Sequence, residues 1–150
     1  MQSTLFNRVL TSKAGTAALI LRVPVGLILM AHGAQKLFGW FGGNGLAGTA
    51  GWLSSIGLEP GYLMAILAGG AEFFGGLALV LGLLTRPAAL VAAFTMLVAI
   101  FSVHIGSGLF IANGGYEYAL TLMVALLALV VQGGGAISMD KVLSKNLGRA

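Results

Sequence analysis

The chain of 150 residues carries a net charge of +4, with 58% hydrophobic and only 8% charged residues, and its mean hydropathy is +0.99. A soluble domain has about 25% charged residues, so this composition excludes a soluble globular protein and predicts a single membrane domain over residues 1–150. The basic residues are dispersed, which argues against nucleic acid as a partner, and the lack of cysteine excludes disulfides, thiolate metal sites and CxxC redox chemistry.

Four apolar stretches follow one another along the chain, and each has about the 20 residues that a helix needs to cross a hydrocarbon core. They cover residues 15–34, 61–84, 87–108 and 118–137. The fourth is the weakest, because Gln132 and the glycines at 133–135 dilute its end. The first is too long for the apolar part of a cleaved signal peptide, and Arg22 interrupts it. The sequence therefore predicts an all-α bundle of four transmembrane helices in a lipid bilayer.

Lysine and arginine residues in the tails and connections predict the orientation of the bundle. Six of them fall on one side of the predicted membrane and only Lys36 on the other; the six are Arg8, Lys13, Arg86, Lys141, Lys145 and Arg149. Both termini are therefore expected in the cytoplasm. In a bacterium the connections 35–60 and 109–116 would then face the periplasm.

The connection 35–60 is less polar than an ordinary loop. Its aromatic residues are of the kind found at the headgroup level: Phe38, Trp40, Phe41 and Trp52. Residues that recur at helical spacing are Leu46, Ala50, Leu53 and Gly57. They predict a short interfacial helix, either a lid over the bundle or a plain anchor. The G-x-G-x-x-G match within GGNGLAG follows a predicted span instead of a strand, so we attribute it to chance.

Two opposite charges, Arg22 and Glu72, interrupt the first and second stretches. A helical rise of about 1.5 Å per residue places them about 18 and 16 Å from the outer side, near the same level. Consecutive helices of a bundle are normally neighbours, and an unpaired charge in hydrocarbon is costly. The sequence therefore predicts an Arg22–Glu72 ion pair, either structural or part of a proton relay. A stripe of small residues on the second helix would allow close approach of the first: Ala68, Ala71, Gly75, Ala78 and Gly82.

A second group of polar residues gathers near the predicted outer ends of the helices. These candidate ligand-binding residues are His32, Lys36, His104, Asn113 and Glu117. Each also has a structural interpretation: Lys36 as an interface anchor, Glu117 and Asn113 as caps of the fourth helix, and the histidines as donors to neighbouring carbonyls. Up-and-down connectivity brings all of them to one side, and this convergence favours a site.

The order and spacing of several short motifs resemble those of the DoxX family, small four-span proteins of the bacterial inner membrane. The motifs are AHGAQKLFGWFGG (31–43), GGLALVLGLLTRPAAL (75–90), NGGYEYAL (113–120) and GGGAISMD (133–140), together with Arg22, Glu72 and His104. The resemblance covers about residues 15–141, with Gly134 standing where relatives often have proline. It implies a multi-pass inner-membrane protein. Relatives include subunits associated with thiosulfate:quinone oxidoreductase and proteins linked to quinone stress, so the resemblance also implies redox chemistry around quinones.

Two functional hypotheses follow. In the first, His32 or His104 bonds a quinone or another small aromatic molecule, Lys36 or Arg22 stabilises its reduced form, and Glu72 or Glu117 relays protons. An oxidoreductase partner subunit would supply the electrons, because the sequence has no obvious site for an electron carrier. Two lone histidines are a weak signal for haem, and the histidines with a carboxylate are a weak signal for a metal. In the second, the chain is a non-catalytic scaffold or conducts a small solute or protons. The sequence leaves open whether the protein is an enzyme.

Overall fold

The computed structural model describes residues 8–147, and within that range every regular element is helical. This confirms the predicted all-α class. Three stretches are long and apolar enough to cross a membrane: α2 (Ala17–Phe38), α4 (Gly61–Leu81), and α5 (Thr85–Ala99) with the helical turns that continue it to Ser107. A fourth apolar helix, α6 (Glu117–Gln132), is shorter, with 16 residues. Arg149, one of the residues behind the predicted orientation, lies outside the described residues.

The helix boundaries differ from the predicted ones where a glycine has a positive φ. α2 continues past residue 34 to Phe38 and ends at Gly39, whose φ is 72°. α6 ends at Gln132 instead of residue 137, because Gly133 has a φ of 76°. Such a residue commonly terminates a helix, since only glycine takes this conformation without steric cost. As a result, Lys36 belongs to α2 and not to the connection that follows it.

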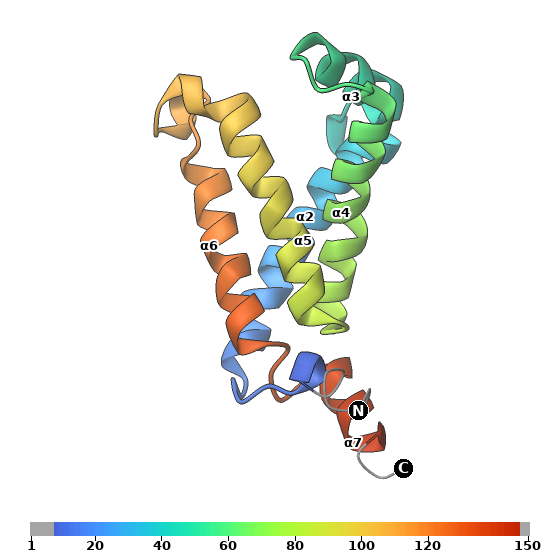
Figure 1. Cartoon of the computed structure of the whole chain (residues 1–150), viewed down its shortest axis with the longest axis vertical. Coiled ribbons are helices and arrows are strands. Elements are labelled where there is room, and N and C mark those ends of the chain that lie inside the picture. The colour runs from blue at the N-terminus through green and yellow to red at the C-terminus, as the bar shows by residue number, and fades with distance from the viewer. Residues whose placement is uncertain (1–7, 148–150) are drawn as a thin grey trace.

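Two shorter α-helices, α3 and α7, also lie within the described residues. α3 (Gly45–Ser55) lies in the first connection and confirms the helix predicted there. It packs on α4, where Ala50 and Leu53 contact Ala65. α7 (Met139–Leu147) follows α6 at the end of the molecule where both ends of the chain lie (Figure 1). We call this end the terminal end, and the end that carries α3 and residues 105–116 the loop end.

The long helices form two pairs, α2 with α4 and α5 with α6. The pairs lie close together at the terminal end and diverge towards the loop end (Figure 1). Helices α2, α5 and α6 share the main core, whose fully buried side chains include Leu29, Leu126 and Leu129. The two pairs therefore pack most closely at the terminal end, and α4 and α5 separate towards the loop end (Figure 1).

Glycines on both helices set the close contact of α2 with α4. A Cβ atom on Gly26 would lie 2.6 Å from the carbonyl oxygen of Gly76, so any larger residue would push the backbones apart. The predicted small-residue stripe is only partly oriented as expected, because Gly75 faces Ala88 and Ala92 of α5. This contact fixes the register of the two antiparallel helices and hence the partners of their charged residues.

Candidate functional site

A cleft of about 430 Å³ lies between α4 and α5 and extends below α3. Its walls are mainly apolar. They include Leu53 and Trp52 of α3, Leu67, Ala68 and Ala71 of α4, and Val91, Phe94 and Val98 of α5. Leu67 and Phe94 are 55% and 63% exposed, so part of the wall lies on the outer flank of the bundle. A mainly apolar cleft with few polar groups is typical of a site for a small organic ligand.

Lys36 and Glu72 place an ion pair in the wall of this cleft. The Lys36 Nζ atom donates a hydrogen bond to Oε2 of Glu72 across 2.5 Å. The Glu72 side chain is 6% exposed, whereas that of Lys36 is 28% exposed. The carboxylate is therefore held inside the bundle by its partner, and the ammonium group stays accessible from the cleft.

The predicted Arg22–Glu72 ion pair is wrong. Arg22 donates to backbone carbonyl oxygens at the terminal end: Gly134 at 3.2 Å, Leu79 at 2.8 Å and Val80 at 2.5 Å, and also Ile137. Arg22 is further from the loop end than predicted, because α2 runs to Phe38 and Arg22 lies close to the other end of that helix. In the register of the two helices, Arg22 lies beside Val80, and Lys36 lies beside Glu72.

His104 also lines the cleft, from a π-helical turn (Ile100–His104) that continues α5. Its Nδ1 atom lies 2.7 Å from the carbonyl oxygen of Gly114 and donates to it, because a carbonyl can only accept. In a neutral imidazole this leaves Nε2 as an acceptor. The structure thus brings two of the five predicted ligand-binding residues, Lys36 and His104, into one cleft with Glu72.

The other three predicted residues have different surroundings. The ring of His32 packs against Tyr118 of α6, with 6.0 Å between the ring centres. Glu117 accepts a hydrogen bond from the backbone N–H of Ile111 at 2.7 Å and so orders the loop before α6. Asn113 is exposed at the end of the 3₁₀ turn Ile111–Asn113. Being on the same side of the bundle did not bring these residues into the cleft.

Two polar residues of α5 and of the π-helical turn after it were not predicted from the sequence. Thr95 and Ser102 both line the cleft, and Val98 lies between them on the same helix face. The separation of seven residues between Thr95 and Ser102 was the available signal, because positions seven apart lie on one helical face. It was overlooked because hydroxyl residues are common in membrane helices and carry no charge.

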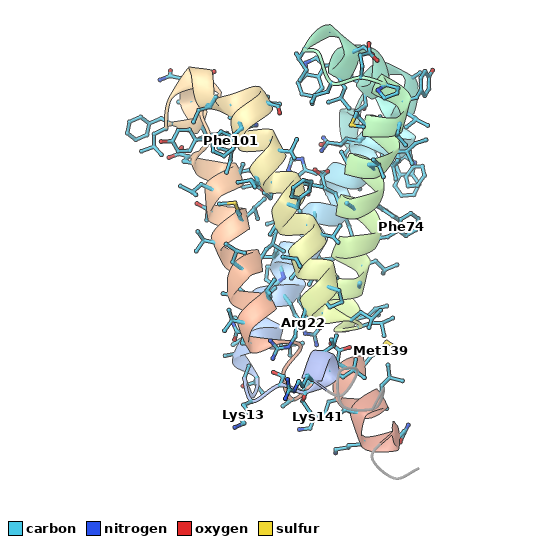
Figure 2. The ribbon with its side chains drawn as sticks, in the orientation of Figure 1. Lys13, Arg22, Phe74, Phe101, Met139 and Lys141 are labelled. Atoms are coloured by element: carbon cyan, nitrogen blue, oxygen red, sulfur yellow. The ribbon has the colours of Figure 1, made fainter. Side chains whose placement is uncertain are left out.

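A second group of polar contacts ties the helices together at the terminal end. The buried Asp140 carboxylate accepts hydrogen bonds from the backbone N–H groups of Leu84 (2.6 Å) and Thr85 (2.9 Å), at the start of α5. Arg86 donates to the carbonyl oxygens of Val130 and Val131, both at 2.6 Å. These contacts join the start of α5 to Asp140 and to the last turn of α6. Figure 2 shows Arg22 at this end of the molecule, with Met139 and Lys141 of α7 nearby.

No three histidine or carboxylate side chains among residues 8–147 come together in a group that could hold a metal ion. The polar groups of the cleft are one ammonium, one carboxylate, one imidazole and two hydroxyls. The indole of Trp52 is the other polar side-chain group among the described residues that line the cleft. These groups can form hydrogen bonds with a ligand and can stabilise charge on it.

Comparisons with known proteins identify the relatives of this chain. The family model described as DoxX matches residues 17–105. An uncharacterized protein of Haemophilus influenzae is 32% identical over 88% of this chain and 86% of its own length. "Inner membrane protein YqjF" of Escherichia coli is 36% identical over 71% of this chain and 81% of its own. "Putative oxidoreductase CatD" of Bacillus subtilis is 32% identical over 85% of this chain and 87% of its own length. No solved structure matches significantly.

Proposed function

The chain belongs to the DoxX family of membrane proteins, and from that premise we propose that its cleft binds a quinone or a similar lipophilic aromatic molecule. The protein would act as a redox-associated subunit of the bacterial inner membrane. The observation that carries the proposal is the position of the Lys36–Glu72 ion pair in the wall of a mainly apolar cleft. One relative, CatD, has a name that mentions an oxidoreductase, which agrees with this theme.

The chemistry of the cleft suits a molecule with an apolar body and one or two oxygen atoms. The ring and any alkyl tail would contact the apolar walls, including the aromatic residues Trp52 and Phe94. An ammonium group has three N–H donors, so Lys36 can donate to a ligand oxygen and to Glu72 at once. Nε2 of His104 can accept a hydrogen bond from the hydroxyl of a reduced quinol. Arg22 has no part in this proposal, since its donors are used at the terminal end.

Reduction of a quinone to a quinol takes two electrons and two protons. The electrons would come from an oxidoreductase partner subunit, as the sequence predicts. Lys36 would stabilise the negative charge that develops on the quinone oxygen, because a charged donor is most effective in a site shielded from water. The Lys36–Glu72 pair would pass the two protons to the quinone oxygens in turn and would regain a proton from the outer side after each transfer.

We further propose that α6 is the fourth transmembrane helix and that both termini are cytoplasmic. The described basic residues at the terminal end support this orientation: Arg8, Lys13, Arg86, Lys141 and Lys145. The wide part of the cleft, under α3, would then face the periplasmic side. Because exposed apolar residues such as Leu67 and Phe94 also border it, a lipophilic ligand could enter from the bilayer.

Tryptophan fluorescence tests the proposal, because Trp52 lines the cleft and the sequence has only one other tryptophan, Trp40. The variant Trp40→Phe keeps Trp52 as its only tryptophan. In detergent, titration with a short-chain ubiquinone should quench its emission to a saturating level. Lys36→Met in the same background should weaken this quenching about tenfold, the effect of losing one charged hydrogen bond of about 1.5 kcal/mol.

Two matched variants complete the experiment. Trp52→Phe keeps only Trp40, outside the residues that line the cleft, and should show weak, linear quenching. His32→Gln changes a histidine that packs against Tyr118 and should leave saturation at Trp52 unchanged. Linear quenching of Trp52, or equal quenching in the Lys36→Met variant, would contradict the proposal. The chain would then be better described as a membrane scaffold or a conductor of small solutes or protons.

A further inference from the structure

A second hollow lies at the terminal end of the molecule, between α7 and the ends of α2 and α4. This groove has a volume of about 620 Å³ and is distinct from the cleft between α4 and α5. Lys141 and Lys145 of α7 line one side, and Leu19 of α2 and Leu81 of α4 line the other. Figure 2 shows Lys141 and Met139 on α7 below the helix ends, with Arg22 nearby.

The positive charge of the groove is not neutralised. No aspartate or glutamate of residues 8–147 lines it, and neither lysine side chain forms a salt bridge with any of those residues. Asp140, the nearest acidic residue in the sequence, is buried and bonded to the N–H groups of Leu84 and Thr85. The two lysines are four residues apart, so they lie on one face of α7. Two adjacent ammonium groups without a counterion favour an anionic ligand.

The same groove has an exposed apolar wall. Leu81 is 44%, Ile137 58%, Met139 43% and Val142 59% exposed. This wall continues onto the flank of α4, where Leu77 is 36% exposed and where a transmembrane helix contacts lipid tails. A water-soluble anion would leave these side chains uncovered, whereas an amphipathic anion would cover them.

We propose that this groove binds an anionic phospholipid. Its phosphate would lie between Lys141 and Lys145, since lysine is a common phosphate ligand in proteins. One acyl chain would run along Ile137 and Leu81 into the bilayer. Arg22 also lines the groove, but it is only 2% exposed and bonded to backbone carbonyls, so it adds positive charge to the groove while its N–H donors stay occupied. The bound lipid would hold α7 against the membrane surface, as anionic headgroups do for other basic helices next to membranes. This site does not depend on the quinone proposal.

The full chain, purified in a neutral detergent, can be titrated with phosphatidylglycerol or phosphatidylcholine of the same acyl composition. Native mass spectrometry then measures the fraction of protein that carries one lipid. We expect phosphatidylglycerol to bind the more tightly. The double variant Lys141→Gln/Lys145→Gln should weaken its binding about thirtyfold, from the usual contribution of two lysines at an anionic surface. Both lysines are exposed, so circular dichroism should show an unchanged helix content.

The matched control is Arg8→Gln/Lys13→Gln, which removes the same charge from the same end of the molecule but outside the groove. It should bind phosphatidylglycerol as tightly as the unchanged chain. Equal weakening in the two double variants would show a general charge effect and overturn the proposal. Equal binding of the two lipids would overturn it as well. Displacement of phosphatidylglycerol by millimolar inorganic phosphate would show that the groove takes free phosphate and not a lipid.

Discussion

Lys36 and Glu72 stabilise each other in a part of the bundle where neither charge would be stable alone. Glu72 is almost completely buried, and its carboxylate is paired with the Lys36 ammonium group 2.5 Å away. Lys36 comes from α2 and Glu72 from α4, and the pair therefore also joins two helices. A ligand that bonds Lys36 must do so without separating the pair, or must replace Glu72 as its partner.

A double-mutant cycle tests this pairing. Glu72→Gln and Lys36→Met should each lower the free energy of unfolding by about 2 kcal/mol, because each leaves the other charge without its partner. The double variant should lose less than the sum, with a coupling of about 1–2 kcal/mol. Unfolding in mixed micelles, followed by circular dichroism, measures these differences. In the control cycle, Arg22→Met and Glu72→Gln should be additive within about 0.5 kcal/mol. Additivity in the first cycle, or coupling in the control, would contradict the observed pairing.

Arg22 offers a second test at the level of one residue, because its planar guanidinium reaches carbonyl oxygens on two different segments. Arg22→Lys keeps the charge but offers only one nitrogen, so some of these carbonyls would lose their donor. We expect the free energy of unfolding to fall by about 2 kcal/mol or more. Arg8→Lys, at an exposed position, is the control and should have no measurable effect. If Arg22→Lys were equally harmless, the contacts of Arg22 would contribute little to stability.

The sequence predicted that Glu72 needs a cation, and it named Lys36 as a ligand-binding candidate, but it did not join the two. A carboxylate within an apolar stretch is enough to show that a partner is needed, because an unpaired charge in hydrocarbon is costly. The choice of partner depends on helix register, which depends in turn on where α2 ends and on which glycines touch α4. Neither is visible in a hydropathy pattern.

At the scale of elements, the contact of α2 with α4 depends on glycine. A Cβ atom on Gly76 would lie 2.5 Å from the carbonyl oxygen of Gly26 and 2.8 Å from the backbone nitrogen of Met30. Gly76→Ala should therefore force the helices apart and cost about 1–3 kcal/mol. Gly70→Ala on the same helix is the control, because no described atom lies within 4 Å of its added Cβ. It should be neutral or stabilising by about 0.5–1 kcal/mol, since alanine favours a helix. Equal effects of the two substitutions in chemical denaturation would contradict the close packing.

The start of α5 shows a different limit of sequence-based prediction. The side chain that bonds the first N–H groups of α5 is Asp140. A cap usually lies next to its helix, whereas Asp140 follows Thr85 by 55 residues. A contact between such distant residues requires the fold, although both segments stood out as family motifs.

At the scale of the whole molecule, the amino-acid composition was sufficient to predict a membrane protein. The helical content, the apolar stretches and the helix in the first connection followed from hydropathy and periodicity. The divergence of the two helix pairs did not, because it results from side-chain packing between segments that are distant in sequence (Figure 1). The cleft exists because of that divergence, so the residues that line it could be predicted only in part.

The number of spans remains the main prediction at this scale, and α6 decides it. With 16 residues, α6 is about 24 Å long, somewhat shorter than a hydrocarbon core of about 30 Å. A helix of this length can still cross if the bilayer thins locally, at a modest cost.

If α6 crosses the membrane, a periplasm-dependent reporter such as alkaline phosphatase should be active when inserted at Asn113 and inactive when fused after Ala150. Insertion at Gly57, in the exposed connection after α3, should be active as well and serves as the control. If α6 does not cross, the reporters at Asn113 and after Ala150 will give the same result, because both would lie on one side of the membrane. If instead the reporter at Asn113 is inactive and the one after Ala150 is active, the chain has four spans in the inverted orientation. The wide part of the cleft would then lie on the cytoplasmic side.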